Sequence, residues 1–382
     1  RAKMDACDAL IVGAGPAGSA CAWALRQAGI DTVIIDKRAF PRDKVCGGWI
    51  TPAVLEELRI DPAEYAKTGV LQPLTGFRTS RIGGGEVCTN YGQPVSYGLR
   101  RCEFDAYLLS RSGARVLQNT ALKSLERSGE HWIANGEIKT RMLIGAGWHF
   151  CPVARYLGAD ARKETAVAAQ EIEFEMTPEQ RENCSIRGDV PELFFCADMK
   201  GYGWCFRKQN FLNIGLGRLD PRGLPSHVAS FVEFLRKSGK VTFDLPVPML
   251  GHAYLLYSKT NRKLVDEGAI LIGDAAGVAY SQSGEGIRPA IESGLLAAKV
   301  IAAACGKYSR QSLEPYRAAL SARFGESGRD LSTSVGARLP SRLIDVLGRL
   351  LLTNGWFSRH VILDRWFLHR NQPALRFGAA AS

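Results

Sequence analysis

The sequence predicts an α/β fold in which a parallel sheet, assembled from separate stretches of chain, is combined with an inserted antiparallel sheet and C-terminal helices. Three observations predict it. Residues 9–36 have the pattern of a strand, a glycine turn, a helix and a second strand. Residues 166–218 alternate apolar and polar positions, as antiparallel strands with one buried face do. Residues 268–304 return to an apolar strand, a glycine loop and a long helix, so the first unit is expected to be discontinuous.

The opening unit has the spacing of a dinucleotide-binding turn. An apolar run over residues 9–12 is typical of a strand buried on both faces. The three glycines that follow, spaced G-x-G-x-x-G, permit a tight turn, a close approach to a pyrophosphate and close packing of helix on strand. A helix over residues 16–28 follows, whose first amides can face an anion. The residues expected at the turn are Gly13, Gly15, Pro16, Ala17 and Gly18.

The second strand, over residues 32–35, ends in an acid. Asp36 lies 18 residues after Gly18, where a carboxylate can bond a ribose hydroxyl. An acid there favours a ribose without a 2′-phosphate, and so NAD or FAD rather than NADP. Lys37 follows and is kept as a candidate at the same site, although a solvated strand end is the interpretation we prefer.

The remaining elements follow from local pattern. Residues 38–60 are expected to form a loop and a short helix, and residues 70–97 short strands. An amphipathic helix is expected from about Cys102, then a strand, a small meander and a buried strand at residues 142–144. A further helix is expected near residues 225–238.

Composition sets limits on function. At 382 residues with 46% hydrophobic residues the chain is expected to form two interleaved domains with a buried core. No uncharged apolar run of membrane-spanning length and no signal-peptide pattern is found, so we expect a cytoplasmic protein. The ten cysteines include no C-x-x-C pair, so we expect free thiols and no metal.

The net charge of +11 needs an explanation. No recognition-helix or RNP-like signature is present, so no nucleic-acid partner is expected. Residues 336–376 contain seven arginines but only two acids, Asp345 and Asp364. Basic and apolar positions alternate there at helical spacing. Two amphipathic helices covering the core are one interpretation. Contact with an anionic membrane surface or a lipid phosphate is the other, and it would make the protein peripheral to a membrane.

Four motifs resemble one enzyme family. Arg101 stands in R-x-x-F-D before a helix, and "ILIGDAAG" is followed by "SGEGI", whose first glycine, Gly284, lies ten residues after Asp274. Both are similar to motifs of FAD proteins in the p-hydroxybenzoate hydroxylase superfamily. "KVCGG" at 44–48 and "GYGWCFRK" at 201–208 resemble the geranylgeranyl reductase family, which typically shows K-P/V-C-G-G and G-Y-x-W-x-F-P-K. The resemblance covers roughly residues 5–330.

The resemblance implies an FAD cofactor and a role for each motif. The opening turn would take the pyrophosphate, Asp36 the adenosine ribose, and Arg101 the pyrophosphate charge through a bidentate contact. Asp274 would bond hydroxyls on the ribityl or phosphate side. Amides at the start of the last long helix would face the flavin edge where negative charge develops on reduction. The further cofactor-binding residues implied are Gly273, Gly284, Glu285, Gly286, Ile287, Cys46, Gly47 and Gly48.

One departure from the superfamily pattern concerns the electron donor. Where the superfamily carries G-A-D-G and a serine, this chain has Gly147 for the aspartate, Trp148 for the glycine and Cys151 for the serine. That motif is tied to both FAD and reduced pyridine nucleotide, so direct reduction by NAD(P)H is in doubt and a redox protein is the alternative donor. His149 and Cys151 could form a functional pair, but a packed histidine and a buried thiol are the preferred interpretation.

The substrate side depends on an aromatic strand. Tyr202, Trp204 and Phe206 alternate, so they share one face of a strand, and as a wall they would suit an apolar substrate. In the resembled fold Cys46 would lie close to the flavin, where it either donates a proton or packs. Trp49 would narrow the cavity, and Arg207 replaces the family's proline.

We therefore expect a Rossmann-like FAD-binding domain over residues 1–69, 98–160 and 262–330, a substrate domain over 70–97 and 161–261, and a C-terminal helical segment over 331–382. The expected activity is FAD-dependent reduction of C=C bonds in a lipophilic, isoprenoid-like substrate. One alternative is a monooxygenase or dehydrogenase acting on a small or carrier-bound aromatic. The other is a flavoprotein that acts on a protein partner.

Overall fold

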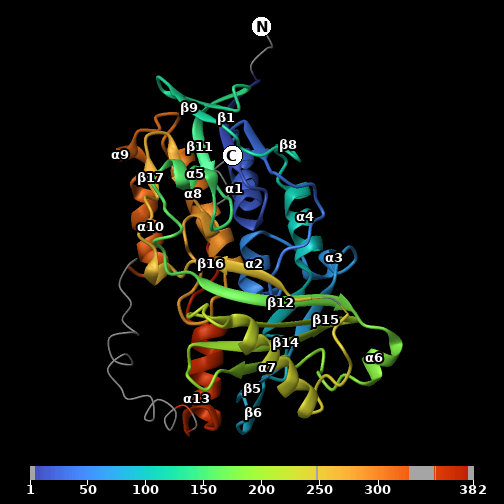
Figure 1. The fold of residues 1–382 in the computed structure, drawn as a ribbon. Coiled ribbons are helices and arrows are strands. Elements are labelled where there is room, and N and C mark those ends of the chain that lie inside the picture. The colour runs from blue at the N-terminus through green and yellow to red at the C-terminus, as the bar shows by residue number, and fades with distance from the viewer. Residues whose placement is uncertain (1–4, 247, 327–347, 349, 377–382) are drawn as a thin grey trace.

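A parallel sheet brings together strands from distant parts of the chain, from β1 near the N-terminus to β18 (Figure 1). The computed structural model describes residues 5–246, 248–326, 348 and 350–376. The strand order is β17-β18-β11-β1-β2-β8, and β18, β11, β1, β2 and β8 are mutually parallel. The bounds are β1 Asp5–Val12, β2 Thr32–Ile35, β8 Arg115–Leu117, β9 Leu125–Ser128, β10 His131–Ala134, β11 Ile138–Gly145, β17 Val265–Asp266 and β18 Ala269–Leu271. β9 and β10 form the expected meander on β11.

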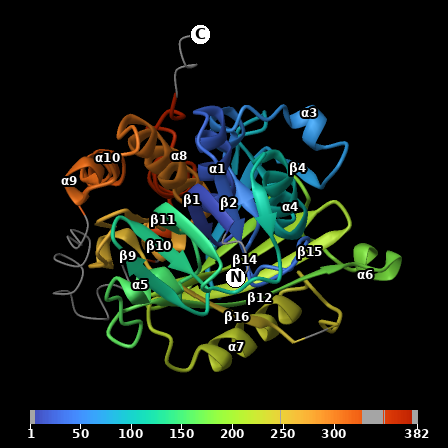
Figure 2. The same ribbon diagram turned by 90° about the horizontal axis from the view of Figure 1, so that it is seen from above.

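Two helices from opposite ends of the chain lie side by side on this sheet (Figure 2). They are α1, Pro16–Gln27, and α8, Ile287–Ala303. Their backbones approach so closely that a Cβ at Gly294 would overlap the carbonyl oxygen of Ala17. The expected long helix after the glycine loop is therefore confirmed, and it completes the first unit from a distant part of the sequence. The other helices around this sheet are α4 Arg101–Arg111, α5 Pro152–Tyr156, α9 Arg310–Leu313 and α10 Pro315–Phe324.

A second sheet of seven strands lies below the first in Figure 1. Its order is β16-β12-β15-β14-β13-β5-β6. The bounds are β5 Gly76–Arg81, β6 Glu86–Asn90, β12 Val167–Glu175, β13 Glu192–Phe195, β14 Gly201–Lys208, β15 Phe211–Arg218 and β16 Leu250–Tyr254. Most pairs are antiparallel as expected, but β13 pairs with β5 in parallel, because these strands come from distant stretches and not from one hairpin. Helix α7, Leu224–Lys237, covers one face through Leu224, Val228 and Phe231.

Short elements connect the two large sheets. A three-stranded sheet has the order β3-β7-β4, with β3 Trp49–Ile50, β4 Leu71–Leu74 and β7 Ser96–Leu99. The helices α2 Pro52–Glu57, α3 Pro62–Tyr65 and α6 Pro178–Glu182 and the 3₁₀ turns Tyr257–Lys259 and Gly273–Ala275 complete the set. We keep the assignment of one domain to each large sheet, with the boundaries given above, as a prediction.

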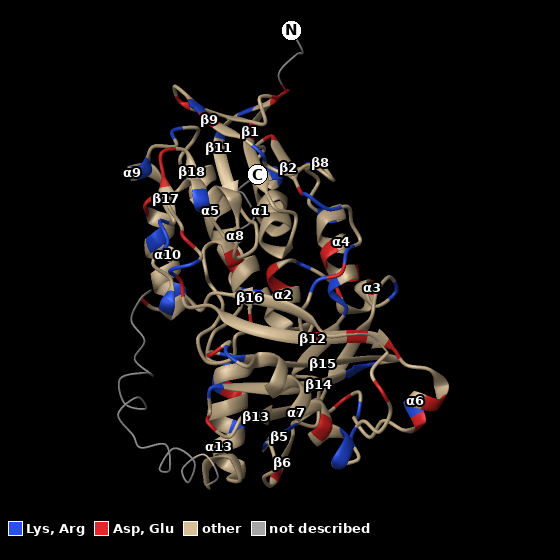
Figure 3. Ribbon diagram, in the orientation of Figure 1, with Lys and Arg blue, Asp and Glu red and all other residues tan. Residues whose placement is uncertain are grey.

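The C-terminal segment covers the other face of the second sheet. Its described part contains α13, Gly355–Phe357, and a π-helical stretch, Ser358–Phe367. Ile362, Leu363 and Phe367 are buried against aromatic side chains of the sheet, so over this stretch the apolar face covers the core. The rest of the expected basic helices, at residues 336–347 and 349, lies outside the described residues. Lys and Arg occur on many elements, with acidic residues between them (Figure 3).

Candidate active site

The three glycines of the turn have different surroundings. A Cβ at Gly13, which has φ of +118°, would overlap the Ala146 carbonyl, and a Cβ at Gly18 would overlap the Gly13 carbonyl. These two glycines are required by packing of the chain on itself. At Gly15 the nearest atom to an added Cβ is Nη2 of Arg42, 3.7 Å away, so this backbone borders open space. The turn therefore offers bare backbone at the start of α1, where amides attract an anion.

Two cavities meet at this turn and form one trough. The larger has an empty volume of about 1160 Å³, counted to its opening, and runs from the turn to the second sheet. The smaller runs from the turn to the end of β2. Both are lined by Gly15, Ala146, Gly147 and Trp148. A trough with a long arm and a short arm around a helix N-terminus has the form that a dinucleotide needs.

The trough brings together most of the residues expected from the sequence. The larger cavity is lined by Gly15, Pro16, Ala17, Cys46, Gly47, Gly48, Trp49, Arg101, Tyr202, Trp204, Phe206, Asp274, Gly284, Glu285, Gly286 and Ile287. The smaller is lined by Gly13, Gly15, Asp36 and Lys37. Gly18 and Gly273 do not line either cavity but allow the chain to pack closely behind the trough. A Cβ at Gly273 would stand 2.7 Å from Cβ of Ala17.

Asp36 closes the end of the short arm. Its Oδ2 accepts a hydrogen bond of 2.8 Å from the amide of Ala14, and its Oδ1 one of 2.9 Å from the amide of Arg38. These contacts fix the carboxylate at the rim, beside Lys37. The geometry suits a ribose, because a carboxylate keeps further lone pairs for hydroxyl donors.

Arg101 is committed to a partner that the sequence did not indicate. It begins α4 and donates to Asp105 through Nε at 2.8 Å and Nη2 at 3.0 Å, so a carboxylate already takes one of its two bidentate edges. Arg42 lies 3.4 Å from the same Asp105, but its buried Nη1 makes no hydrogen bond. Since Arg42 also lies nearest to Gly15, it is the better placed cation for a pyrophosphate. The basic loop after the second strand was the available signal for it.

Four cations surround Trp148, the residue that departs from the superfamily motif. The ring centroid lies 4.5 Å from Nζ of Lys44 and 5.0 Å from that of Lys37, and 5.6 Å from the guanidinium carbons of Arg38 and Arg42. The indole face attracts these cations, and burial lowers the pKa of Lys44 to about 8. The junction of the two arms is therefore strongly basic.

His252 on β16 adds a neutral ring beside these cations. Its Nε2 lies 3.0 Å from Nζ of Lys44 and 3.8 Å from Oδ2 of Asp274. Burial and the neighbouring Lys44 lower its pKa to about 3, so the imidazole accepts from the lysine. Sequence reasoning missed His252, because nothing marked the edge strand β16 as part of the site.

The aromatic strand faces the cavity as expected. Tyr202, Trp204 and Phe206 of β14 line it, while Cys205 between them is buried in the opposite core. Tyr202 donates its hydroxyl to the carbonyl of Ser283, and Trp204 donates Nε1 to Asn213 at 2.8 Å. The apolar end is closed by Trp49 and by Phe367, whose ring centroids are 5.9 Å apart. Phe367 comes from the C-terminal segment, for which covering the core was one of the two interpretations of the sequence.

The loop formed by Cys46, Gly47 and Gly48, the CGG loop, packs against the aromatic residues of β14. A Cβ at Gly47 would stand 3.4 Å from Nε1 of Trp204, and Gly48, at φ of +61°, would overlap the Leu99 carbonyl if it carried one. The Cys46 carbonyl accepts from Asn213 at 3.2 Å, and its Sγ accepts from the amide of Gly48 at 3.4 Å. The loop is thus held by its own backbone. Whether the thiol donates a proton stays a prediction.

His149 and Cys151 occupy structural positions. His149 is buried, with Nδ1 3.2 Å from Nη2 of Arg262, which also bonds Glu164. Burial and Arg262 lower the pKa of His149. Cys151 is buried beside Gly147, and burial raises its pKa. Both features fit the packed histidine and buried thiol that we preferred.

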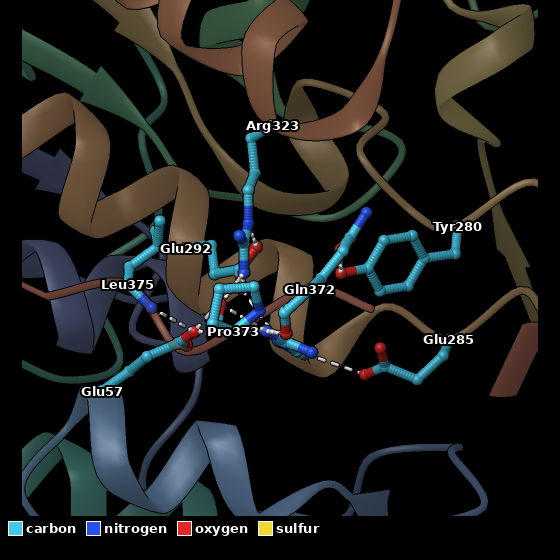
Figure 4. A network of polar contacts seen from close by, with 9 residues as sticks. Glu57, Tyr280, Glu285, Glu292, Arg323, Gln372, Pro373 and Leu375 are labelled. Atoms are coloured by element: carbon cyan, nitrogen blue, oxygen red, sulfur yellow. Dashed lines mark hydrogen bonds and ion pairs between the residues drawn. The ribbon is translucent and has the colours of Figure 1, made fainter. Parts of the chain in front are cut away.

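The start of α8 is tied to the C-terminal segment (Figure 4). Glu285 accepts from the amide of Arg288 at 2.8 Å, so this helix has a carboxylate at its start, and burial raises the pKa of Glu285 to about 7. The Arg288 side chain donates to Glu292 at 2.8 Å and to the carbonyl of Gln372 at 2.9 Å. Glu57 accepts from the amide of Leu375 at 3.1 Å. The contacts link the trough to the last described residues.

The residues present fit FAD. Bare backbone at Gly15, the hydrogen-bonding capacity left on Arg42 and an acid at the end of the short arm match the parts of a dinucleotide. In the described part of the chain no group of three His, Cys, Asp or Glu is placed to hold a metal. None of the described helices is long and apolar enough to cross a bilayer.

Comparison with known proteins agrees with this geometry. Residues 11–65 match a family model described as an NAD(P)-binding Rossmann-like domain. The chain is 31% identical over 323 residues to a menaquinone reductase of Mycobacterium tuberculosis, covering 78% of this chain and 77% of the relative. It is 28% identical over 332 residues to a digeranylgeranylglycerophospholipid reductase of Methanocaldococcus jannaschii, covering 83% and 82%.

A solved structure supports the fold over almost the whole chain. A geranylgeranyl bacteriochlorophyll reductase-like protein of Thermoplasma acidophilum superposes with a TM-score of 0.77 at 22% identity, covering 97% of this chain and 99% of that one. The two chains therefore share one fold over nearly their whole lengths. Together with the identity to the mycobacterial reductase over more than three quarters of both chains, the glycine trough and the CGG loop place this chain in the geranylgeranyl reductase-like family of FAD-dependent oxidoreductases.

Proposed function

We propose that this enzyme reduces C=C bonds in an isoprenoid lipid. The observation that carries the proposal is the continuity of the FAD trough with an aromatic and aliphatic chamber. The chamber walls come from Trp49, Leu193, Tyr202, Trp204, Phe206 and Phe367. The named substrates of the relatives, menaquinone and digeranylgeranylglycerophospholipid, both carry isoprenoid chains. Relatives named reductases favour this activity over oxygenation or action on a protein partner.

The chain's own residues position both reactants. Reduced FAD supplies two electrons and one hydrogen to the alkene, and a second hydrogen must arrive as a proton. The pyrophosphate would lie against Gly15 and Arg42, and the ribose against Asp36. The aromatic wall removes the alkene from water and orients it, and Phe367 closes the chamber at its far end.

The test is reduction of a defined lipid by the FAD-loaded protein. The protein is reduced with dithionite without oxygen and mixed with either menaquinone or digeranylgeranylglycerophospholipid. We expect flavin reoxidation, together with a mass gain of about two per reduced bond, the mass of two hydrogen atoms. Leu193→Glu, which places a charge in the chamber, should abolish lipid reduction while FAD stays bound. Oxygen consumption with a hydroxylated product and no reduced lipid would contradict the proposal.

We also propose that the C-terminal segment contacts a membrane surface, where such a lipid resides. Leu350 is 64% exposed and Trp356 65% exposed, and Arg365 nearby in sequence is also exposed. Exposed apolar and basic side chains together suit the interface of an anionic bilayer. The full chain should sediment with anionic phosphatidylglycerol vesicles, and Trp356→Ser should reduce the bound fraction. Equal binding of both proteins would contradict this proposal.

A further inference from the structure

A second acidic group, which the sequence did not indicate, lies in the chamber. Glu171 stands on β12, is 4% exposed and lines the larger cavity. It pairs across the sheet with Gly215 of β15. A Cβ at Gly215 would overlap the Trp204 ring and stand 2.8 Å from Cβ of Glu171. The absent side chain therefore lets the carboxyl and the indole lie next to each other on the wall that faces the substrate.

Glu171 differs from Glu173, the half-buried carboxylate on the same face. Glu173, two residues further along β12, accepts from Lys208 at 2.6 Å and from Asn213 at 3.2 Å. Among the described residues no cation forms an ion pair with Glu171, and its buried Oε2 has no hydrogen-bond partner. A buried oxygen without a partner is costly, and it is stabilised when a ligand or a proton reaches it.

The surroundings of Glu171 favour its protonated form. Burial raises its pKa to about 7, and Glu173 adds to this effect. Lys208 on β14, the backbone amide of Cys46 and the side chain of Asn213 act in the opposite direction. The neutral His252 lines the same cavity from β16, where its strand neighbour is Ala169. A carboxyl that keeps its proton close to neutral pH can both donate it and recover it.

We propose that Glu171 is the catalytic acid that protonates the alkene carbon during reduction. The inference rests on the proposed function and assigns the proton that function requires. While the reduced flavin supplies two electrons and one hydrogen to one alkene carbon, the Oε2–H bond of Glu171 breaks. Its proton bonds to the other alkene carbon, the carboxylate keeps the electron pair, and solvent returns the proton.

The geometry favours Glu171 over the nearby thiol for this role. Sγ of Cys46 accepts the amide hydrogen of Gly48, which ties the sulfur to the turn of its own loop. Oε2 of Glu171 has no such tie and borders the space that a substrate would fill. The amide of Cys46 also stabilises the carboxylate that remains after proton transfer. The loop thus positions the acid.

The test compares Glu171→Gln with Glu175→Gln. Glutamine keeps the shape of the side chain but carries no acidic proton, and Glu175 is an exposed acid four residues along the same strand. FAD-loaded proteins, reduced with dithionite, are mixed with digeranylgeranylglycerophospholipid or menaquinone, whichever the parent reduces. Flavin reoxidation should slow by about 100-fold in Glu171→Gln, as expected on loss of a general acid, and should match the parent in Glu175→Gln. The decline of the parent's rate above neutral pH should disappear.

A measurement without FAD or lipid tests the same carboxyl. Infrared titration of the cofactor-free protein should show protonated carboxyl absorption that is lost around neutral pH, to which Glu285 also contributes. The part due to Glu171, measured as the difference from the parent, should be missing in Glu171→Gln and kept in Glu175→Gln. An unchanged band, or reoxidation of Glu171→Gln at the parental rate, overturns the inference while lipid reduction by the parent stands. Loss of the pH dependence in Cys46→Ser and not in Glu171→Gln also overturns it. Failure of the parent to reduce either lipid overturns the proposed function, and the inference with it.

Discussion

At the scale of single residues, the trough contains two kinds of residue: those that pack against or bond to the protein itself, and those that remain available to a ligand. Gly13 and Gly18 have backbone against them, whereas Gly15 has open space. Arg101 gives its Nε and Nη2 donors to Asp105, whereas the buried Nη1 of Arg42 makes no hydrogen bond. The sequence does not distinguish the three glycines from one another, or the two arginines from each other. The structure predicts that substitutions of the three glycines should have different consequences, and so should substitutions of the two arginines.

Gly15→Val should yield a folded protein without flavin. A Cβ at this position meets no atom closer than 3.7 Å, so the chain tolerates it, but the branched methyl groups extend into the pyrophosphate space. The ratio of flavin to protein absorbance should fall close to zero, with an unchanged far-UV circular dichroism spectrum. Gly251→Val is the matched control, because nothing lies within 4 Å of that position. Normal flavin content in Gly15→Val would show that the turn is only structural.

The two arginines should separate affinity from stability. Arg42→Gln removes the free donor beside Gly15, and we expect FAD affinity to fall about tenfold, or about 1.4 kcal/mol, with little change in melting temperature. Arg101→Gln leaves the fully buried Asp105 without its bidentate partner, which should cost about 3–5 kcal/mol of unfolding free energy. Fluorescence titration with FAD and thermal unfolding measure the two effects. Weak FAD binding by a stable Arg101→Gln protein would instead assign the pyrophosphate to Arg101.

At the scale of elements, the sequence predicted those that local pattern determines. Helix α1, helix α8 and strand β2 appear at the expected residues, because caps, glycines and periodicity define them locally. The parallel pairing of β13 with β5 was not predictable, since the two strands are brought together by elements on both sides of them. The same holds for Glu171 and Phe367, whose roles depend on what packs across the chamber.

The C-terminal segment should respond to pH through Glu57. Burial and the neighbouring Glu292 raise the pKa of Glu57 well above its usual range, while Arg323 helps lower that of Glu292. A raised folded-state pKa gives stability that is complete below the unfolded pKa and is lost as pH rises through the folded value. Glu57→Gln cannot ionise and can still accept from Leu375, so its melting temperature relative to the parent should rise from ~pH 5 to ~pH 9.

Two observations check that expectation. Exposed Glu64, on α3, forms a surface ion pair with Lys67, and Glu64→Gln should show no such rise relative to the parent between ~pH 5 and ~pH 9. In the parent, the melting temperature itself should fall from ~pH 5 to ~pH 9, because ionised Glu57 is buried beside Glu292. A constant difference between Glu57→Gln and the parent would show that Glu57 does not titrate in this range.

At the scale of the whole molecule, the sequence predicted a two-sheet flavoprotein and left the electron donor open. The net charge of +11 and the basic junction around Trp148 are the features that bear on it. The sequence located Trp148 by its departure from the superfamily motif. It could not show that four cations converge on the ring, because Lys37, Arg38, Arg42 and Lys44 reach it only when the loop after β2 folds back.

Free NADH or NADPH should therefore reduce the bound flavin slowly. The aspartate that the superfamily couples to pyridine nucleotide is replaced by Gly147, and Trp148 fills the junction of the trough. Anaerobic stopped-flow mixing measures the rate from flavin absorbance, with dithionite as the control that the flavin is reducible. A small acidic redox protein, such as a ferredoxin, should be faster, and its rate should fall steeply from about 0.05 M to about 0.5 M salt, because a strongly positive acceptor attracts it at long range. Rapid reduction at micromolar nicotinamide, unaffected by salt, would contradict this assignment of the donor.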